Sequence, residues 1–266
     1  MKPAIHFQHT VKMIHGSHAV FIDNLKILER ECVAFYGLSD DTAQIITRQI
    51  TAACSPEQGN LFLFDTESRQ MNDSSWFQYI GTFAIYSVVA PLKAKASIGE
   101  NIATLIRSRI PSIEEPQLSA MVLNVANLVQ LTITDLSRTI SVAGSSLIMK
   151  ARVARALAFK PRLIIFHEPT RDLSQNLRHK FVELIRRTRR KLKYTALIFT
   201  SDVRLLQELA DRVLFLNPST GVVVENQLRE WYHNLLPILQ PSPSKLLQLA
   251  RNILQHGGVH KTEVSG

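Results

Sequence analysis

The feature that most constrains the fold is a strand, helix and strand pattern between residues 162 and 200. Arg162–Phe166 and Ala196–Thr200 are short apolar runs, which predict buried strands. The helix between them carries its apolar residues on one stripe, at Leu177, Phe181, Leu184, Ile185 and Leu192. Strands joined by such a crossover run parallel. The sequence therefore predicts an α/β fold with a parallel sheet covered by helices.

The rest of the chain divides into a β-rich start, a helical block and a closing helix with two strands. We expect strands at Ala4–His9, Ala19–Leu28, Cys32–Tyr36, Asn60–Phe64, Tyr79–Ala84, Arg212–Leu216 and Val222–Glu225. We expect helices at Ile98–Arg109, Pro116–Gln130, Ser145–Phe159 and Val203–Ala210. These elements predict a core domain at residues 1–225 with a helical subdomain at about 98–158. A C-terminal helical extension is expected at 226–266.

Composition places the chain among ordered globular proteins. It has 266 residues, of which 45% are hydrophobic and 20% charged. The net charge of +9 favours contact with nucleic acid, an anionic membrane surface or an acidic partner, without choosing among them. The longest nearly apolar stretch, Tyr79–Leu92, is too short for a membrane-spanning helix. Few cysteines and a start unlike a signal peptide favour a cytoplasmic location.

Several segments resemble the ATPase subunits of ABC transporters, in the order in which that family has them. The opening of such a subunit resembles VFIDNLKILERECVAFYGLSDDTAQIITRQITAACSPEQGNLFLFD. Later matches are SIGENIA, KARVARALAFKPRLIIFHEPTRDLS and ALIFTSDVRLLQELADRVLFLN. The resemblance covers most of Ala19–Glu225 and implies a P-loop NTPase core of the ABC ATPase type, with a β subdomain and an inserted helical subdomain. The helical block is most similar to ATPases of bacterial MCE-type lipid transport systems.

The segment at the place of the phosphate-binding loop departs from the family pattern GxxxxGK[ST]. In that pattern glycines let backbone N–H groups wrap the phosphates, Lys neutralises them and a hydroxyl binds Mg²⁺. The segment here reads Gly37, Leu38, Ser39, Asp40, Asp41, Thr42, Ala43 and Gln44. The resemblance places Ala43 at the Lys position and Gln44 at the hydroxyl position. A carboxylate about 5 Å from a phosphate charge costs about 3 kcal/mol at an effective dielectric near 20, so we expect ATP not to bind in the usual pose.

Taken alone, the same residues indicate an ordinary strand, turn and helix. Ser39, Asp40 or Asp41 would then cap a helix that starts near Thr42.

The other catalytic positions that the resemblance implies are also altered. His167 stands where the family has an Mg²⁺-binding Asp, and Glu168 stands at the general base. Because Mg²⁺ prefers oxygen ligands, we expect Glu168 to be a relic or a structural hydrogen-bonding group, and we expect no metal or cofactor. Ser201 stands at the place of the family's switch histidine.

The family's LSGGQ signature aligns with Ala143, Gly144, Ser145, Ser146 and Leu147. In an ABC dimer this segment faces the nucleotide of the partner. Ser145 and Ser146 could therefore contact a γ-phosphate held by another chain. An ordinary serine-rich helix cap explains these residues equally well.

These substitutions predict a subunit that is not an enzyme: a catalytically inactive ABC ATPase-like protein with a structural or regulatory role in a membrane transporter, of the lipid-transport kind. Expected partners are an ABC permease and either a catalytic ATPase subunit or a second copy of this chain. The expected location is the inner face of the cell membrane, with the permease held in a groove near Ser87–Ile98. One alternative is nucleic-acid binding through the basic helix Arg186–Lys193, which no nucleic-acid motif supports. The other is an enzyme with altered nucleotide chemistry.

Overall fold

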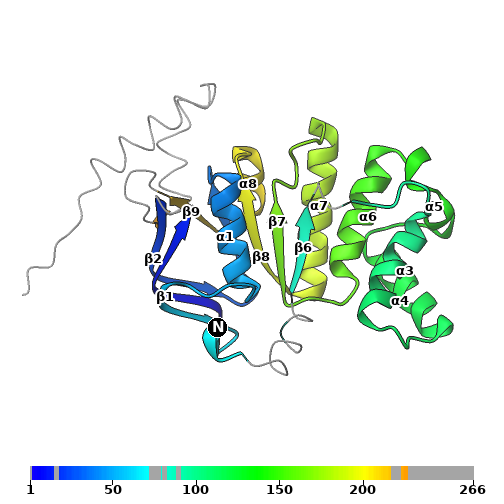
Figure 1. The fold of residues 1–266 in the computed structure, drawn as a ribbon. Helices are drawn as coiled ribbons and strands as arrows, with labels where there is room; N and C mark the ends of the chain where they lie inside the picture. The colour runs from blue at the N-terminus through cyan, green and yellow to red at the C-terminus, as the bar shows by residue number, and fades with distance from the viewer. Residues whose placement is uncertain are drawn as a thin grey trace, which may run out of the picture. The chain divides into compact units, whose positions relative to one another are not determined.

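A six-stranded sheet contains the parallel pairs that the sequence predicts (Figure 1). Its strands, in spatial order, are β10 (Val223–Asn226), β9 (Arg212–Leu216), β3 (Cys32–Tyr36), β8 (Thr195–Thr200), β7 (Leu163–His167) and β6 (Phe83–Ser87). Neighbouring strands from β9 to β6 run parallel, and β10 pairs antiparallel with β9. The strand, helix and strand unit is β7, α7 (Gln175–Leu192) and β8, which confirms the predicted α/β fold.

The computed structural model describes residues 2–14, 18–71, 79, 83–87, 91–216 and 223–226. They belong to one compact unit, Met1–Asn226. The C-terminal helices that we expect after residue 226 lie outside the described residues. The domain limits 1–225 and 226–266 therefore stay predictions.

A second sheet, of four antiparallel strands, forms the start of the chain. Its strands, in spatial order, are β2 (His18–Leu28), β1 (Pro3–Ile14), β4 (Gln58–Leu63) and β5 (Thr66–Glu67), and a 3₁₀ turn at Ser68–Gln70 follows. β1 continues to Ile14, beyond the expected end at His9, because the residues from Thr10 onward pair with β2. The alternation of apolar residues is interrupted at His9, where φ is +48°, and resumes at Val11 and Met13, so the sequence could have indicated the longer strand.

The helix α1 (Asp40–Ile50) lies between the two sheets (Figure 1). Ile46 and Ile50 are fully buried in one hydrophobic cluster with Phe7 of β1 and Phe199 of β8. Within this cluster Phe35 and Phe199 stack with ring centroids 5.1 Å apart. Burying an aliphatic side chain of this size contributes about 1.5–3 kcal/mol, so α1 joins both sheets into one core.

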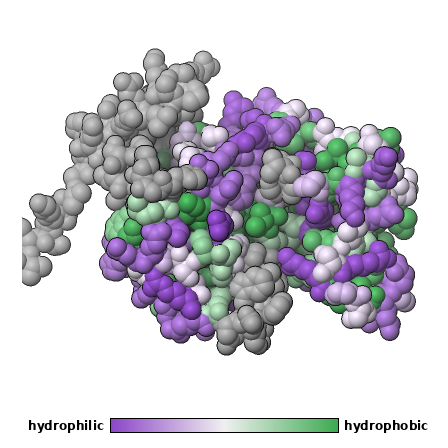
Figure 2. Space-filling model, in the orientation of Figure 1, coloured by the Kyte–Doolittle hydropathy of each residue, from purple (hydrophilic) through white to green (hydrophobic). Residues whose placement is uncertain are grey.

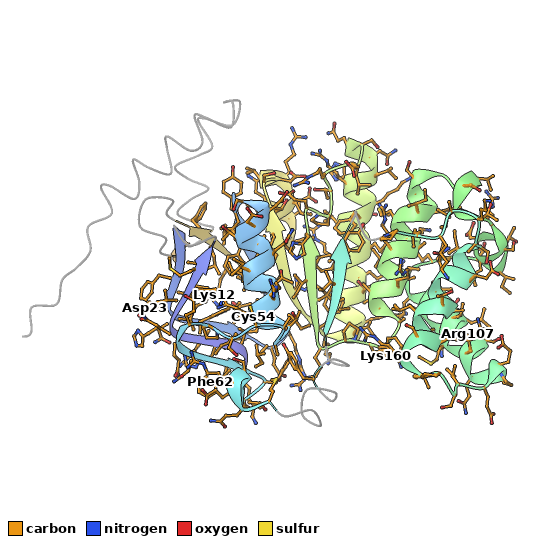
Figure 3. All side chains as sticks on the ribbon, viewed as in Figure 1. Lys12, Asp23, Cys54, Phe62, Arg107 and Lys160 are labelled. Atoms are coloured by element: carbon orange, nitrogen blue, oxygen red, sulfur yellow. The ribbon has the colours of Figure 1, made fainter. Side chains whose placement is uncertain are left out.

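Four helices form the block between β6 and β7. They are α3 (Ile98–Arg109), α4 (Glu115–Leu128), α5 (Ile133–Ser137) and α6 (Ser145–Leu157), with a 3₁₀ turn at Ile140–Val142. Ser97 and Glu100 form a capping box at the start of α3. Arg107 of α3 pairs with Glu115 at 3.0 Å and so joins α3 to the start of α4 (Figure 3). The last helix of the core is α8 (Val203–Leu209), which follows β8.

One predicted strand is misplaced. We expected a strand at Tyr79–Ala84, and the structure has β6 at Phe83–Ser87. Pairing with β7 decides these bounds, because Phe83 lies opposite Leu163 and Ser87 lies opposite His167. The apolar run Tyr79–Leu92 is longer than this strand, so hydrophobicity alone could not place its ends.

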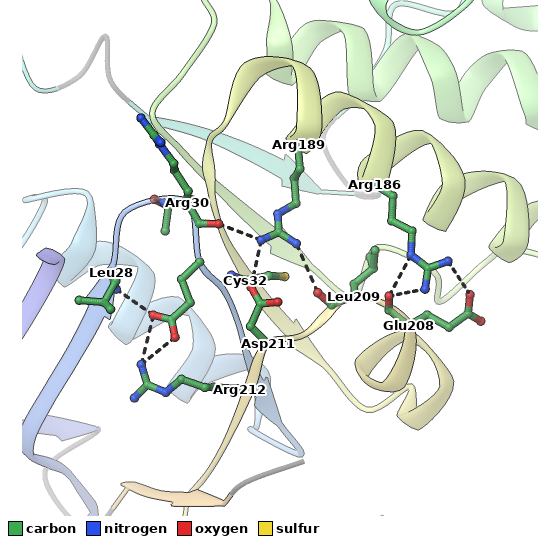
Figure 4. A network of polar contacts seen from close by, with 11 residues as sticks. Leu28, Arg30, Cys32, Arg186, Arg189, Glu208, Leu209, Asp211 and Arg212 are labelled. Carbon is green, nitrogen blue, oxygen red and sulfur yellow. Dashed lines mark hydrogen bonds and ion pairs between the residues drawn. The ribbon is translucent and has the colours of Figure 1, made fainter. Parts of the chain in front are cut away.

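A polar network joins α7 to the loops at the amino ends of β3 and β9 (Figure 4). The Arg189 guanidinium donates to the Arg30 carbonyl at 3.0 Å and to the Asp211 carboxylate at 3.1 Å. The same carboxylate accepts the backbone N–H of Cys32 at 2.7 Å. Cys32 is fully buried, and burial raises the pKa of its thiol to about 12, so it is not a nucleophile at neutral pH.

We predict that Asp211→Ala lowers the free energy of unfolding by about 1–3 kcal/mol, because it leaves the buried N–H of Cys32 without its carboxylate acceptor. Urea unfolding followed by circular dichroism measures this change. Asp65→Asn is the control, since Asp65 forms an exposed ion pair with Lys2 at 3.7 Å, and Asn tolerates the φ of +70° at this position as well as Asp does. Equal stability of the two variants would show that the carboxylate is dispensable.

Candidate functional site

A cleft opens at the carboxyl ends of β3, β7 and β8. This is the edge of a parallel sheet at which α/β proteins bind their ligands. It encloses about 460 Å³. Its walls include Asp40, Ala43 and Gln44 of α1, and His167 and Glu168 at the end of β7. The structure thus brings together five of the residues that the sequence singled out.

The turn between β3 and α1 is short. It consists of Gly37, Leu38 and Ser39, and Gly37 adopts φ +68°, which glycine reaches without strain. Ser39 is the N-cap, and its side chain accepts the N–H of Thr42 at 3.2 Å. The helix therefore begins at Asp40, two residues before the expected start. Its first turn already uses the N–H of Ala43, which donates to the Ser39 carbonyl at 3.0 Å.

The charges in the cleft come from the first turns of α1 and from the loop after β7. Asp40 and Asp41 lie in the first turn of α1, where carboxylates interact favourably with the helix dipole. Arg171 pairs with Asp40 at 3.4 Å, and both side chains are half exposed or more. Arg48, one helical turn after Gln44, also lines the cleft. Our sequence analysis missed both arginines, although the helical spacing from Gln44 could have indicated Arg48.

His167 is held in place by α1. Its Nε2 lies 2.8 Å from the Thr47 hydroxyl, and its ring stacks on Phe199 with centroids 5.0 Å apart. The one hydroxyl proton of Thr47 goes to the Ala43 carbonyl at 2.8 Å, so the Nε2 of His167 must be the donor. Burial lowers the pKa of His167, and Asp40 partly opposes this shift. The imidazole is therefore neutral at pH 7, with its proton on Nε2.

Glu168 joins the ends of β7 and β8. Its carboxylate accepts the N–H of Ser201 at 2.9 Å, the Ser201 hydroxyl at 3.2 Å and the Thr200 hydroxyl at 3.1 Å. The backbone of Glu168 lies in the left-handed region, at φ +38°, which is strained for a residue with a side chain. Ser201, at the predicted switch position, thus contacts the residue at the predicted base position. In this arrangement three donors occupy the carboxylate.

No family model matches this chain. Named proteins are similar to it in sequence, and solved structures are similar to it in fold. The sequence is 24% identical over 202 residues to the methionine import ATP-binding protein MetN 1 of Burkholderia pseudomallei, covering 76% of this chain and 57% of that protein. It is 26% identical over 216 residues to the sulfate/thiosulfate import ATP-binding protein CysA of Xylella fastidiosa, covering 80% of this chain and 60% of that protein. The chain thus spans a little over half of the length of these relatives.

Solved structures share the fold. The dimeric bacterial ABC transporter cassette MJ0796 has a TM-score of 0.67 at 18% identity, with 85% of this chain and 99% of that chain covered. The cbiO1 protein from Clostridium perfringens, part of the ABC transporter complex cbiONQ, has a TM-score of 0.77 at 15% identity, with 88% and 92% covered. The fold is that of an ABC ATPase cassette. The sequence is homologous to ATP-binding subunits of ABC import systems.

These relatives overturn one prediction. We expected that the chain is not an enzyme. This prediction is wrong, because its relatives are named as ATP-binding proteins of import systems. The prediction followed from the substitutions between Gly37 and Gln44 together with those at His167, at Ser201 and in the segment Ala143–Leu147. Those substitutions describe how this cassette differs from the family pattern, and they do not decide whether it takes ATP.

The side chains at the family's metal positions do not fit Mg²⁺. Mg²⁺ is bound through oxygen in near-octahedral geometry. His167 offers nitrogen, and its Nε2 is already a donor to Thr47. Gln44 supplies an amide in place of the hydroxyl. Among the residues that the structure describes, no group of three His, Cys, Asp or Glu side chains is arranged to hold a metal ion.

The signature segment lies apart from the cleft of its own cassette. Gly144 is the N-cap of α6, and Ser145, Ser146 and Leu147 form the first turn of that helix. Ser145 is exposed, while Ser146 and Leu147 are partly buried. None of the four lines the cleft at α1. Any contact of these serines with a nucleotide would therefore be with one held by another chain.

The basic helix that motivated the nucleic-acid alternative uses its arginines within the cassette. Arg186 donates to the Glu208 carbonyl at 2.6 Å, and Arg187 donates to the Leu128 carbonyl at 2.8 Å. Arg189 belongs to the network described above. These bonds use N–H donors of the three guanidinium groups and fix their positions within the cassette, so fewer of their donors are available for phosphates. The nucleic-acid alternative loses its support.

We predict that His167 makes the stability of the cassette pH-dependent. Its pKa in the folded protein is lowered by burial, so protonation favours the unfolded chain. The stabilisation is complete above the ordinary histidine pKa near 6.5 and is lost as the pH falls below it. Between about pH 7.5 and 5.5, urea unfolding should show that the free energy of unfolding falls less for His167→Gln than for the natural protein. His179→Gln is the matched substitution, because it changes an exposed histidine of α7, whose Nδ1 lies 3.9 Å from the Glu208 carboxylate.

Proposed function

We propose that this chain is the nucleotide-binding cassette of an ABC import complex, paired with a second cassette and docked on a membrane permease. The observation that supports the proposal is the agreement of fold and sequence: the likeness to import ATP-binding proteins extends over 76% and 80% of this chain, and the likeness to an ABC transporter structure over 88% of it. Among the described residues, no helix is long and apolar enough to cross a membrane. Figure 2 shows hydrophilic side chains over much of the visible face. A place at the inner face of the membrane would therefore come from the permease.

The nucleotide would occupy the cleft at the start of α1, with its phosphates near different cations from those of the family pattern. In place of a lysine in the loop, the cleft has the guanidinium groups of Arg48 and Arg171. Guanidinium groups bind phosphate oxygens well, because their donors form a planar fork. Asp40 lines the same cleft and opposes these phosphates, and Asp41, next to it in the first turn of α1 but not on the cleft wall, adds a weaker repulsion.

This assignment predicts that removing the two carboxylates strengthens nucleotide binding. The variant Asp40→Asn with Asp41→Asn should bind ATP at least about tenfold more tightly, since each carboxylate repels a nearby phosphate by up to about 3 kcal/mol before solvent screening. Arg48→Gln should weaken binding. Isothermal titration calorimetry with and without Mg²⁺ measures both changes.

Asp65→Asn is the matched control, because it removes one carboxylate from the end of the other sheet. If all variants bind ATP with the affinity of the natural protein, the nucleotide does not lie against α1.

Assembly tests the proposal as a whole. The full chain, tagged and expressed in its own cells, should copurify with a protein of several membrane spans and with a second cassette, which is either another copy or a different ATPase. In the reconstituted complex, Ser145→Trp with Ser146→Trp should lower ATP hydrolysis if these serines complete the site of the partner. Unchanged hydrolysis would show that these serines do not contribute to the site of the partner; they are not the helix cap either, since the N-cap of α6 is Gly144 and no side chain caps this helix.

The resemblance of the helical block and the names of the relatives favour different transported substrates. The helical block resembles that of lipid transport systems, which favours a lipid. The relatives are named for the import of methionine, sulfate or thiosulfate, and Fe(3+) ions, which favours a small solute. Identification of the copurified permease would decide between these cargo classes.

A further inference from the structure

The two positions from which the family pattern holds Mg²⁺ carry other chemical groups in the cleft at α1. Gln44 has a neutral amide where the pattern has a hydroxyl, and His167 has an imidazole where it has a carboxylate. The Nε2 of His167 already donates to the Thr47 hydroxyl, at 2.8 Å. Mg²⁺ takes oxygen ligands in near-octahedral geometry and is usually bound through a carboxylate of the protein. These two side chains therefore do not provide for the ion.

The oxygen atoms close to these positions are held by hydrogen bonds within the cassette. The Ser39 hydroxyl accepts the N–H of Thr42 at 3.2 Å and lies 2.8 Å from the Thr42 hydroxyl. The Thr47 hydroxyl donates to the Ala43 carbonyl at 2.8 Å. The Glu168 carboxylate accepts three donors from the end of β8 and the residue after it. An ion bound by any of these groups would have to replace hydrogen bonds that stabilise the fold.

Two guanidinium groups supply the positive charge of the cleft. Arg48 of α1 lines it, and the structure gives the side chain of Arg48 no hydrogen bond or ion pair with another described residue. Arg171, after β7, lines it too and donates to Asp40 at 3.4 Å. Since a guanidinium has five N–H donors, this bond leaves most donors of Arg171 available. Both side chains can therefore bind phosphate oxygens directly.

The donor set points to a nucleotide without its metal ion. We propose that the cleft binds metal-free nucleoside triphosphate, whose phosphates are neutralised by Arg48 and Arg171 in place of Mg²⁺. Mg²⁺ cancels about half of the charge of a triphosphate, so the complexed nucleotide attracts the two guanidinium groups less and brings a cation beside them. The inference deepens the proposed function and rests on it, because it names the form of nucleotide that the same cleft takes.

Isothermal titration calorimetry of the full chain with ATP tests this inference. One titration contains excess EDTA and the other excess MgCl₂, with NaCl added to equal ionic strength, since salt screens exposed charges. ATP should bind at least about threefold more tightly in EDTA, because the free triphosphate has the larger charge. Arg48→Gln should weaken binding in EDTA by about tenfold and binding in Mg²⁺ by less.

Arg190→Gln is the matched control, since Arg190 is an exposed arginine of α7 that does not line the cleft. It should leave both affinities unchanged. The variant Gln44→Ser with His167→Asp places the ligands of the family pattern in the cleft, and it should bind ATP more tightly in Mg²⁺ than in EDTA. Gln44→Ser alone keeps the bond between His167 and Thr47 and should bring the two affinities closer together. Circular dichroism of each variant separates lost binding from lost folding.

Equal affinities in EDTA and Mg²⁺, or tighter binding in Mg²⁺, in the natural protein would overturn the inference. Both results leave the proposed function standing, because the cleft would still bind nucleotide. Equal loss of binding in Arg48→Gln and Arg190→Gln would also overturn it, because the cations of the cleft would then have no special part. Absence of ATP binding in both titrations would remove the nucleotide from this cleft and overturn the inference together with that part of the proposed function.

Discussion

The parallel pairing of β3, β8 and β7 is the constraint on which the rest of the cassette depends. Because these strands run in one direction, their carboxyl ends meet at one edge of the sheet. That edge receives the turn before α1 from β3, His167 and Glu168 from β7, and Thr200 from β8. The residues are far apart in the sequence and become neighbours only through this register. The strands carry buried apolar residues such as Val33, and a shift of the register by one residue would move these side chains to the opposite face of the sheet.

The short turn before α1 sets the chemistry of the cleft. A phosphate-binding loop works by keeping several N–H groups free of helical hydrogen bonds. Here the helix begins directly after Ser39, and the N–H of Ala43 is used by the helix itself. Two N–H groups at the start of α1, those of Thr42 and Ala43, are thus not free for an anion, so the side chains of the cleft contribute more to binding one. We therefore expect the balance between Asp40 on one side and Arg48 and Arg171 on the other to decide whether the cleft binds a phosphate.

Much of the fold could be predicted from the sequence, because periodicity reports burial. The stripe of α7 and the buried run of β8 placed the central unit, and most helices lie within two residues of their expected ends. The misplaced β6 shows the limit, since only pairing with β7 defines its ends. In the cleft, family alignment found the positions along α1 and at the end of β7. It could not find Thr47 as the partner of His167, because 120 residues separate them and no motif includes both.

The bond between Thr47 and His167 has a mechanical consequence. It fixes the helix that packs against the first sheet to the end of a strand in the second. A ligand that displaced α1 would therefore have to break this bond or move β7 with it. β7 also pairs with β6, which lies at the end of the same sheet. A shift of α1 that carried β7 with it would therefore also have to move β6 or break the pairing between these two strands.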